Sequence, residues 1–202
     1  MACCLWPSLS QTPGGWGIAS ITSAIEAFSG ATFWILTLFA RRLASCSRKG
    51  YYPGMPVDIV RRKPTRTISL RRLKRIAVKI LELVEQEGAE LSVSLVDNRE
   101  IQALNAQFRQ KDTPTDVLSF PVDGPARDSG LLGDVVISVE KAKEQAIERQ
   151  RALDEEIVML LVHGILHLVG YDHERSARDA RIMGRLEKKI YRALCDEGLL
   201  RI

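Results

Sequence analysis

Cysteine is scarce in this chain, and most of it lies at one end. Of the four cysteines, Cys3, Cys4 and Cys46 precede residue 54 and only Cys195 follows it. This distribution argues against a disulfide framework, and a reducing, cytoplasmic compartment is the natural expectation. Histidine, the other common metal-binding residue that is scarce here, has three copies in the whole chain.

Acidic residues are nearly absent from residues 1–54, where Glu26 is the single one. Residues 18–40 are fairly apolar and precede Arg41 and Arg42, a pattern that permits a membrane anchor. Because the segment is rich in serine, an organellar transit peptide is a second interpretation. A third is that natural translation begins at Met55. We favour the third, because regular periodicity starts near Met55, and we treat 1–54 as an extension and 55–202 as the functional domain.

A strong charge of one sign is also lacking from the body of the chain. The formal net charge is +4, and residues 1–54 contribute most of it. A nearly neutral body does not by itself indicate nucleic-acid binding. One stretch is nevertheless basic and free of acids, and it fits either a phosphate-binding surface or a solvated face. Its basic residues are Arg61, Arg62, Lys63, Arg66, Arg71, Arg72, Lys74 and Arg75.

Hydrophobic periodicity divides residues 55–202 into short strands and longer helices. Strands are predicted at residues 57–61, 91–95, 117–120 and 135–138. Helices are predicted at residues 70–87, 97–108, 139–149, 154–169 and 176–196. Residues 121–132, which contain Pro125 and two glycines, are expected to form a flexible loop. The sequence therefore predicts an α+β domain, a small mixed four-stranded sheet packed with about five helices.

The helix predicted over residues 154–169 is apolar around much of its circumference, which is typical of a central buried helix. It carries His163 and His167, four residues apart, whose imidazoles would leave one face a turn apart. Gly170 can take the left-handed conformation that ends a helix, and the chain can then bring His173 back to the other two. A buried pair of histidines needs partners, and a metal ion would supply them.

Three imidazoles with a fourth position left to water are the pattern of a catalytic zinc. The spacing of His163, His167 and His173 also occurs in the metzincin protease motif, which makes shared coordination credible. In those proteases a glutamate general base follows the first histidine, whereas here the position is Gly164. Proton removal would therefore need another group.

The run from His163 to His173, with its Gly-Tyr-Asp-His ending, resembles the signature of the YbeY family of bacterial rRNA maturation factors. Residues 104–112, 113–121 and 132–138 resemble the same family in the same order, so the likeness covers about residues 55–202. It implies a zinc-dependent single-strand endoribonuclease that acts in rRNA processing, 16S rRNA 3′-end maturation and ribosome quality control. The implied partners are single-stranded RNA, rRNA precursors and the ribosome or its small subunit, without stable membrane association of residues 55–202.

The resemblance implies zinc on the three histidines, a cleft along residues 116–120 and an arginine important for activity at Arg109. From its position at a helix end, Arg109 could clamp a phosphate bidentately or could simply favour the helix C-terminus. Asp116 and Asp134 could position RNA, although a strand-end or turn role is the simpler interpretation. The neighbours of His173, which are Asp172 and Glu174, could orient an imidazole or act as a base.

Two other functions remain open at this point. One is a metal-dependent hydrolase of metzincin type, such as a protease, against which Gly164 argues. The other is a non-catalytic ribosome-assembly factor whose zinc is structural and whose basic stretch binds RNA.

Overall fold

The computed structural model describes residues 57–62 and 69–200, so the interpretations of residues 1–54 lie outside the described residues. The described strands are β1 (Val57–Arg61), β2 (Glu90–Val96), β3 (Val117–Pro121) and β4 (Leu131–Ser138). The described helices are α3 (Leu70–Leu83), α4 (Asn98–Arg109), α5 (Pro125–Asp128), α6 (Val139–Glu148), α7 (Leu153–Val169) and α8 (Ala177–Asp196).

The four strands form one mixed sheet in the order β1-β2-β4-β3. β1 and β4 both run parallel to β2, and β3 pairs antiparallel with β4. Parallel neighbours need crossover connections, which α3 provides between β1 and β2. The α+β fold with a mixed four-stranded sheet, as predicted, is confirmed.

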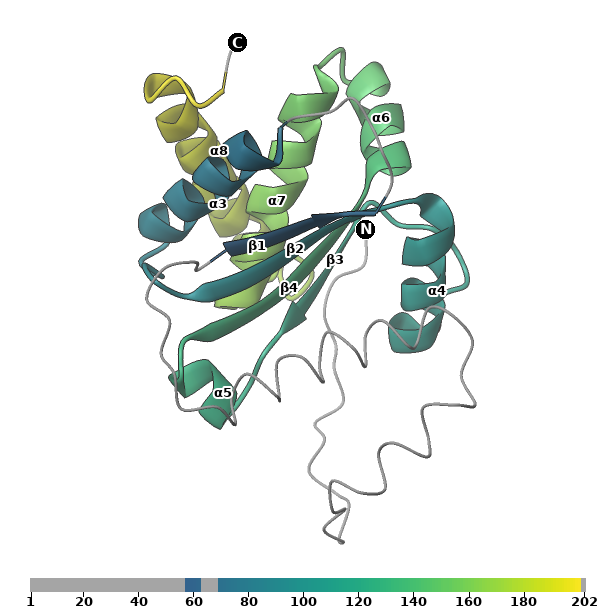
Figure 1. Cartoon of the computed structure of the whole chain (residues 1–202), viewed down its shortest axis with the longest axis horizontal. Helices are drawn as coiled ribbons and strands as arrows, with labels where there is room; N and C mark the ends of the chain where they lie inside the picture. Colours follow the sequence, from purple (N-terminus) through teal and green to yellow (C-terminus); the bar gives the residue numbers. More distant parts are fainter. Residues whose placement is uncertain (1–56, 63–68, 201–202) are drawn as a thin grey trace, which may run out of the picture. The chain divides into compact units, whose positions relative to one another are not determined.

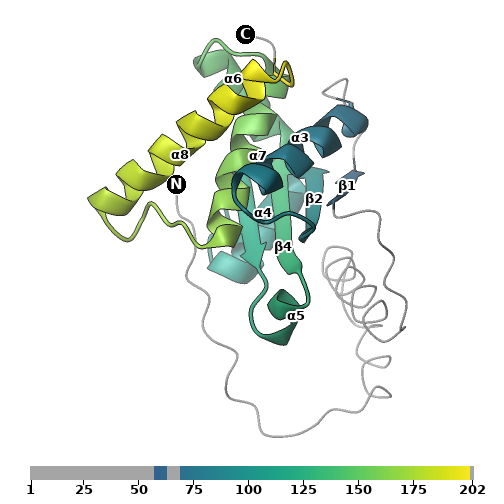
Figure 2. The ribbon, with the colours of Figure 1, turned by 90° about the vertical axis from the view of Figure 1, so that its left-hand side faces the viewer.

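Helices cover both faces of the sheet unequally (Figure 1). On one face, α7 packs on β3 and β4 and also contacts α3, α6 and α8. On the other face, α4 packs against β3 and β4. Figure 2 shows α7 between α3 and α8 on the first face, with α6 near its beginning. The helix that carries the histidine pair is therefore central to the larger layer.

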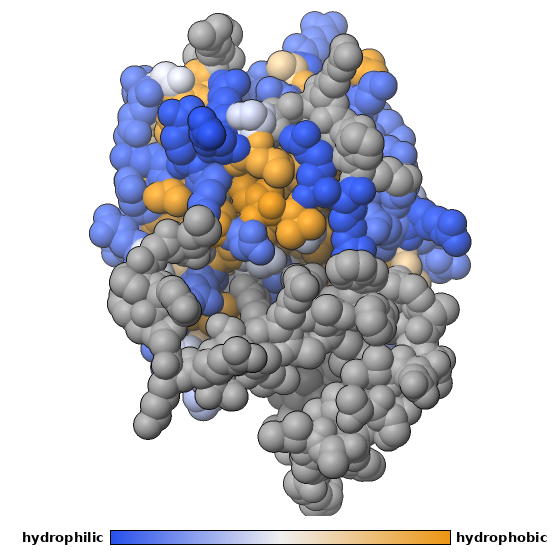
Figure 3. All heavy atoms as spheres, in the orientation of Figure 1, coloured by the Kyte–Doolittle hydropathy of each residue, from blue (hydrophilic) through white to orange (hydrophobic). Residues whose placement is uncertain are grey.

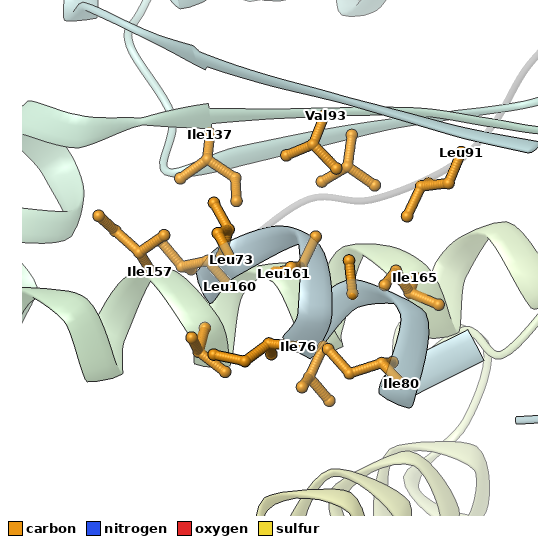
Figure 4. Close-up of a cluster of buried hydrophobic side chains, with 14 of the residues drawn as sticks. Leu73, Ile76, Ile80, Leu91, Val93, Ile137, Ile157, Leu160, Leu161 and Ile165 are labelled. Carbon is orange, nitrogen blue, oxygen red and sulfur yellow. The ribbon is translucent and has the colours of Figure 1, made fainter. Parts of the chain in front are cut away.

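The main core fills the space between the sheet and the helices α3 and α7 (Figure 4). The strands contribute every second residue, such as Leu91, Val93 and Ile137, because side chains alternate across a strand. Helix α7 is buried on nearly all sides, as its continuous apolar sequence predicts. A smaller core on the other face joins α4 to the sheet. It contains Val96, Ile101, Leu118 and Val136.

Side chains cap most of these helices at their first turn. Asp97 accepts from the backbone N–H of Glu100 at 2.8 Å, and the Glu100 carboxylate accepts from the N–H of Asp97, so a capping box begins α4. Ser69, Ser138 and Ser176 cap α3, α6 and α8 in the same way. These caps satisfy backbone N–H groups that have no partner within the helix.

The loop predicted at residues 121–132 is more ordered than expected. It contains the short helix α5, so the described residues hold six helices rather than about five, and β4 begins at Leu131 instead of residue 135. Local chemistry explains both differences. Pro125 suits the first turn of α5, and Gly133 has φ of 146° beside a register shift between β2 and β4. A Cβ on Gly133 would lie 2.3 Å from the carbonyl oxygen of Phe120, so only glycine fits there.

Two smaller expectations also change. Helix α3 ends at Leu83 rather than near residue 87, because Glu85 takes a left-handed φ of 59°. In strand β2, serines alternate with apolar residues, a pattern typical of one buried face, yet Ser92 and Ser94 are buried as well. β2 is an interior strand, so neither of its edges reaches solvent.

Hydrophilic residues cover much of the face drawn in Figure 3, around a hydrophobic area in its upper half. Among the described residues, none of the helices is long and apolar enough to cross a membrane.

Candidate metal centre

The structure brings the three histidines together. His163 and His167 lie one turn apart on α7, which ends at Gly170 with a left-handed φ of 104°. The N–H of Tyr171 then donates to the carbonyl of Leu166 at 3.0 Å, turning the chain back. As a result, one ring nitrogen from each of His163, His167 and His173 lies within 4.8 Å of the others.

The spacing of the ring nitrogens suits a single small cation. Nε2 of His163 and Nε2 of His167 are 3.1 Å apart. Two nitrogens at ordinary zinc–nitrogen distances in a tetrahedral site would be separated by about 3.3 Å. The centroid of the His173 ring lies 5.1 Å from each of the other two ring centroids. The three rings are thus arranged around one point.

Burial gives a second indication of a metal site. Both ring nitrogens of His173 are buried and have no hydrogen-bond partner in the described part of the chain. Buried nitrogen atoms without partners cost free energy, and a cation beside them would remove that cost. His167 is 4% exposed, so its ring is held inside the protein. The donor set of three imidazoles therefore fits a metal ion.

Asp172 shapes the turn that carries His173. One carboxylate oxygen accepts from the backbone N–H of Glu174 at 2.9 Å, and the other lies 3.3 Å from Nε of Arg175. Both oxygens are therefore engaged within the loop. Asp172 was a candidate to orient an imidazole or act as a base, and its contacts with the described residues are those of a residue that stabilises the loop.

A carboxylate that the sequence analysis missed contacts His163. Oε1 of Glu187, on α8, lies 2.8 Å from Nδ1 of that histidine. Glu187 is separated from His163 by 24 positions, so motif spacing could not reveal the pair. One signal was available, because Glu187 interrupts the apolar stripe of Met183, Ile190 and Leu194 on α8.

Gly164 lies against the sheet and not towards the histidine cluster. A Cβ there would lie 2.7 Å from Cγ1 of Val135, and Ser119 donates its hydroxyl to the Gly164 carbonyl at 3.1 Å. This close approach of α7 to β3 and β4 requires glycine. The missing glutamate of the protease motif therefore has a packing reason, since a side chain at this position would enter the sheet.

A cavity of about 320 Å³ lies beside the centre, and His163 and His173 are part of its wall. The other lining residues come from the start of β3, the end of α6, α7 and α8. They are Thr115, Asp116, Val117, Arg149, Glu156, Met159, Leu160, Ala180, Met183, Gly184 and Glu187. A cavity of this volume, lined by both apolar and charged residues, is of a size that takes small molecules or parts of larger ones.

Two charged groups of this wall are held by neighbours. Asp116 accepts from the N–H of Val117 at 2.9 Å and from Nε2 of Gln145 at 2.9 Å, which supports the strand-end interpretation of this carboxylate. The fully buried Glu156 forms an ion pair with Arg149, whose side chain is 41% exposed. Arg149 therefore brings a fixed cation to the rim of the cavity.

Arg109 lies at the end of α4, on the other face of the sheet from α7. It is half-buried and makes no hydrogen bond or ion pair with the described residues, and it does not line the cavity. Its neighbour Phe108 packs edge-on against Phe120 of β3, with ring centroids 5.2 Å apart. The structure thus unites the three histidines and leaves Arg109 outside their immediate surroundings. Asp134 lies on β4, opposite Phe120.

The fold and the site together define a class: a small α+β protein in which three imidazoles could hold one metal ion beside a cavity. Comparison with known proteins gives the family. The profile described as Endoribonuclease YbeY matches residues 58–195, and the chain belongs to this family.

Individual relatives agree with that assignment. An Endoribonuclease YbeY of Persephonella marina is 48% identical over 128 residues, which cover 62% of this chain and 84% of the relative. One from an Anaeromyxobacter species is 45% identical over 146 residues, covering 72% and 74%. A solution structure of a Thermotoga maritima protein is similar with a TM-score of 0.52 at 30% identity, covering 70% of this chain and 91% of that protein.

Proposed function

We propose that this chain is a zinc-dependent endoribonuclease that cleaves single-stranded RNA. The observation that carries the proposal is the convergence of His163, His167 and His173 beside a cavity, in a member of the endoribonuclease YbeY family. Sites of this kind leave one position open on the metal, whereas structural zinc sites close theirs with a fourth protein ligand.

Zinc is proposed because all three donors are neutral imidazoles, a set that suits it. When bound, zinc would lower the pKa of a coordinated water towards neutrality and polarise a phosphoryl oxygen. The protein contributes rigidity, because His163 and His167 extend from a helix that is buried on nearly all sides. His173 is fixed by the turn that Asp172 holds.

RNA would enter through the cavity. Its rim carries the Arg149 guanidinium, which is held in place by Glu156 and can attract a phosphate group. The basic stretch defined in the sequence offers fewer free charges for RNA binding than its composition indicates. Arg72 donates twice to the Leu199 carbonyl, and Arg62 pairs with Glu100 at 3.0 Å, so both have internal roles. Lys63 and Arg66 of that stretch lie outside the described residues.

Arg109 is proposed as the catalytic arginine. Its support is its position in the matching motif, together with a guanidinium that has no partner among the described residues. The packing of Phe108 on Phe120 ties this end of α4 to β3, and Val117, the first residue of β3, lines the cavity. In this role Arg109 would stabilise the extra negative charge on the phosphate in the transition state.

Gly164 cannot act as a general base, so deprotonation must come from elsewhere. An RNA substrate offers its own 2′-hydroxyl as a nucleophile, and its phosphate oxygens can also accept a proton. The chemical nature of the cleavage products distinguishes attack by water from attack by the 2′-hydroxyl. Cleavage by the 2′-hydroxyl leaves a cyclic phosphate, whereas cleavage by water leaves a 5′- or 3′-phosphate.

The biological substrate is proposed to be precursor rRNA in the cytoplasm, including the 3′ end of 16S rRNA. The ribosome or its small subunit would be the partner, with a part in ribosome quality control. These assignments rest on family membership. Comparing Arg109→Ala with the wild type for RNA cleavage and for ribosome association tests them. Loss of cleavage with retained association would support the enzyme, and unchanged cleavage would contradict the role of Arg109.

The alternative of a metzincin-type protease is decided by assaying casein cleavage beside RNA cleavage. The packing of Gly164 against Val135 argues against it, because α7 has no room for the required glutamate. Casein cleavage without RNA cleavage would overturn the proposed function.

A further inference from the structure

Helix α8 carries one carboxylate on the face that packs towards α7. Met183, Glu187, Ile190 and Leu194 share this face at helical spacing, and the three apolar residues are at most 3% exposed. Placing a carboxylate in such a stripe is unfavourable unless a partner stabilises it. In the part of the chain that the structure describes, the partner of Glu187 is His163, and no lysine or arginine pairs with it.

The two ring nitrogens of His163 have different neighbours. Nδ1 lies 2.8 Å from Oε1 of Glu187, and Nε2 lies 3.1 Å from Nε2 of His167. A carboxylate in its ionised form only accepts hydrogen bonds, so the 2.8 Å contact favours the tautomer of His163 that carries its proton on Nδ1. A neutral His163 then presents the lone pair of Nε2 to the histidine cluster.

Helix α8 holds Glu187 in a fixed place. One turn further along, the Tyr191 hydroxyl donates to Oε1 of Glu155 on α7 at 2.6 Å. Burial raises the pKa of Tyr191, and the hydrogen bond to Glu155 raises it further, so the hydroxyl keeps its proton. Lys79 of α3 pairs with Glu197 just beyond α8 at 2.6 Å. The helix that carries the Glu187 carboxylate is thus held in place by contacts with α7 and α3.

We propose that Glu187 is a positioning residue for the metal centre, which fixes the orientation and the tautomer of His163 so that Nε2 faces the ion. The inference rests on the proposed zinc site and deepens it by assigning a carboxylate from another helix. His173 shows the contrast, because neither of its ring nitrogens has a hydrogen-bond partner among the described residues. The three ligands are therefore not held in equivalent ways.

The test compares the wild type with Glu187→Ala, Glu187→Gln and the control Asp196→Ala, which removes an exposed carboxylate from the same helix. Zinc affinity is measured by competition with a chromophoric chelator. Thermal melts of the metal-free proteins check folding. Loss of a carboxylate that orients a metal-bound histidine typically weakens metal binding by roughly 10- to 100-fold. We expect a weakening of that size for Glu187→Ala and none for Asp196→Ala.

Glu187→Gln separates positioning from charge, because its side-chain carbonyl can still accept from Nδ1–H. We expect its zinc affinity to lie between those of the wild type and the alanine variant. A second readout is independent of zinc. Long-range ¹H–¹⁵N spectra of the metal-free wild type should show His163 protonated on Nδ1, and Glu187→Ala should lose this preference.

Equal zinc affinity in Glu187→Ala and the wild type would overturn the inference, as would a wild-type His163 protonated on Nε2 alone. Failure of the proposed zinc site looks different, because the wild type itself would then bind no zinc. In that case the tautomer of His163 would still decide whether Glu187 orients the ring.

Discussion

The two faces of the sheet hold their proposed functional residues in different ways. On the α7 face, His163 and His167 extend from a helix enclosed by α3, α6, α8 and the sheet. On the α4 face, Arg109 lies at the last residue of an amphipathic helix over a core of only a few side chains. The ligands are therefore fixed by packing, whereas the arginine depends on a helix end and the turn after it.

This difference indicates which of three properties, stability, metal binding and RNA cleavage, should change together when a residue is substituted. A change to a ligand or to a fully buried residue of α7 should alter stability and metal binding together, because the residues that flank the ligands belong to the main core. A change at Arg109 should leave both intact and affect chemistry alone. Strand β3 links the two faces, since Phe120 contacts Phe108 while Val117 lines the cavity.

The largest effect is expected from His167→Ala. Removing one of three ligands from the buried helix should abolish stoichiometric zinc binding and, with it, RNA cleavage. Elemental analysis of the purified proteins measures the metal. Val169→Ala, which trims a partly buried residue of the same helix, is the control and should keep its zinc. Equal metal in His167→Ala and the wild type would remove His167 from the site.

On the α4 face, Arg109→Lys should keep zinc and stability but lose most cleavage. Lysine retains the charge but lacks the planar fork that engages two phosphate oxygens. Loss of one such transition-state contact costs roughly 10²–10³ in rate, or about 3–4 kcal/mol. Single-turnover cleavage of a single-stranded RNA measures it, with the exposed Arg99→Lys on the same helix as control. A wild-type rate would reduce Arg109 to a helix-end role.

Gly164→Ala tests the packing of α7 on the sheet. The added Cβ would lie 2.7 Å from Val135, and overpacking of this kind costs about 1–3 kcal/mol of unfolding free energy. Gly184→Ala on α8 is the matched control, because its Cβ would meet no atom within 4 Å. That variant should gain about 0.5–1 kcal/mol from helix propensity. Denaturant unfolding measures both, and equal stability of the two variants would contradict the close approach at Gly164.

The smallest effect is expected from starting the chain at Met55. The residues proposed for the site all lie between Arg109 and Glu187, so the shortened protein should bind zinc and cleave RNA as the full chain does. Side-by-side assays of solubility, metal content and cleavage measure this. Aggregation or loss of zinc would show that the segment is integral to the protein.

Much of the fold could be predicted because its signals are local. The five longer helices and the four strands follow from periodicity. Asp97 and Glu100 indicate where α4 begins, and Gly170 indicates where α7 ends. The convergence of the three histidines was also local, within one helix and the following turn. The order within residues 121–132 was missed because it depends on how β4 meets β2 near Gly133.

The rest of the site depends on contacts between distant segments. Glu187 reaches His163 only because α8 packs on α7, 24 positions further along the chain. Periodicity shows that Glu187 is a charged residue within the apolar stripe of α8, but it does not predict that His163 is its partner. In the same way, the spacing of the histidines would allow a glutamate base at position 164. The close packing of Gly164 against Val135 of the sheet explains why this position is glycine.

Cleavage of RNA by the zinc-loaded protein tests the central claim most directly. Single-stranded and duplex RNA of the same sequence are incubated with the wild type, with and without chelator, and with His167→Ala. The account predicts cleavage of the single strand by the zinc-loaded wild type, little cleavage of the duplex, and none after chelation or in His167→Ala. Undiminished cleavage by the metal-free protein or by His167→Ala would contradict it.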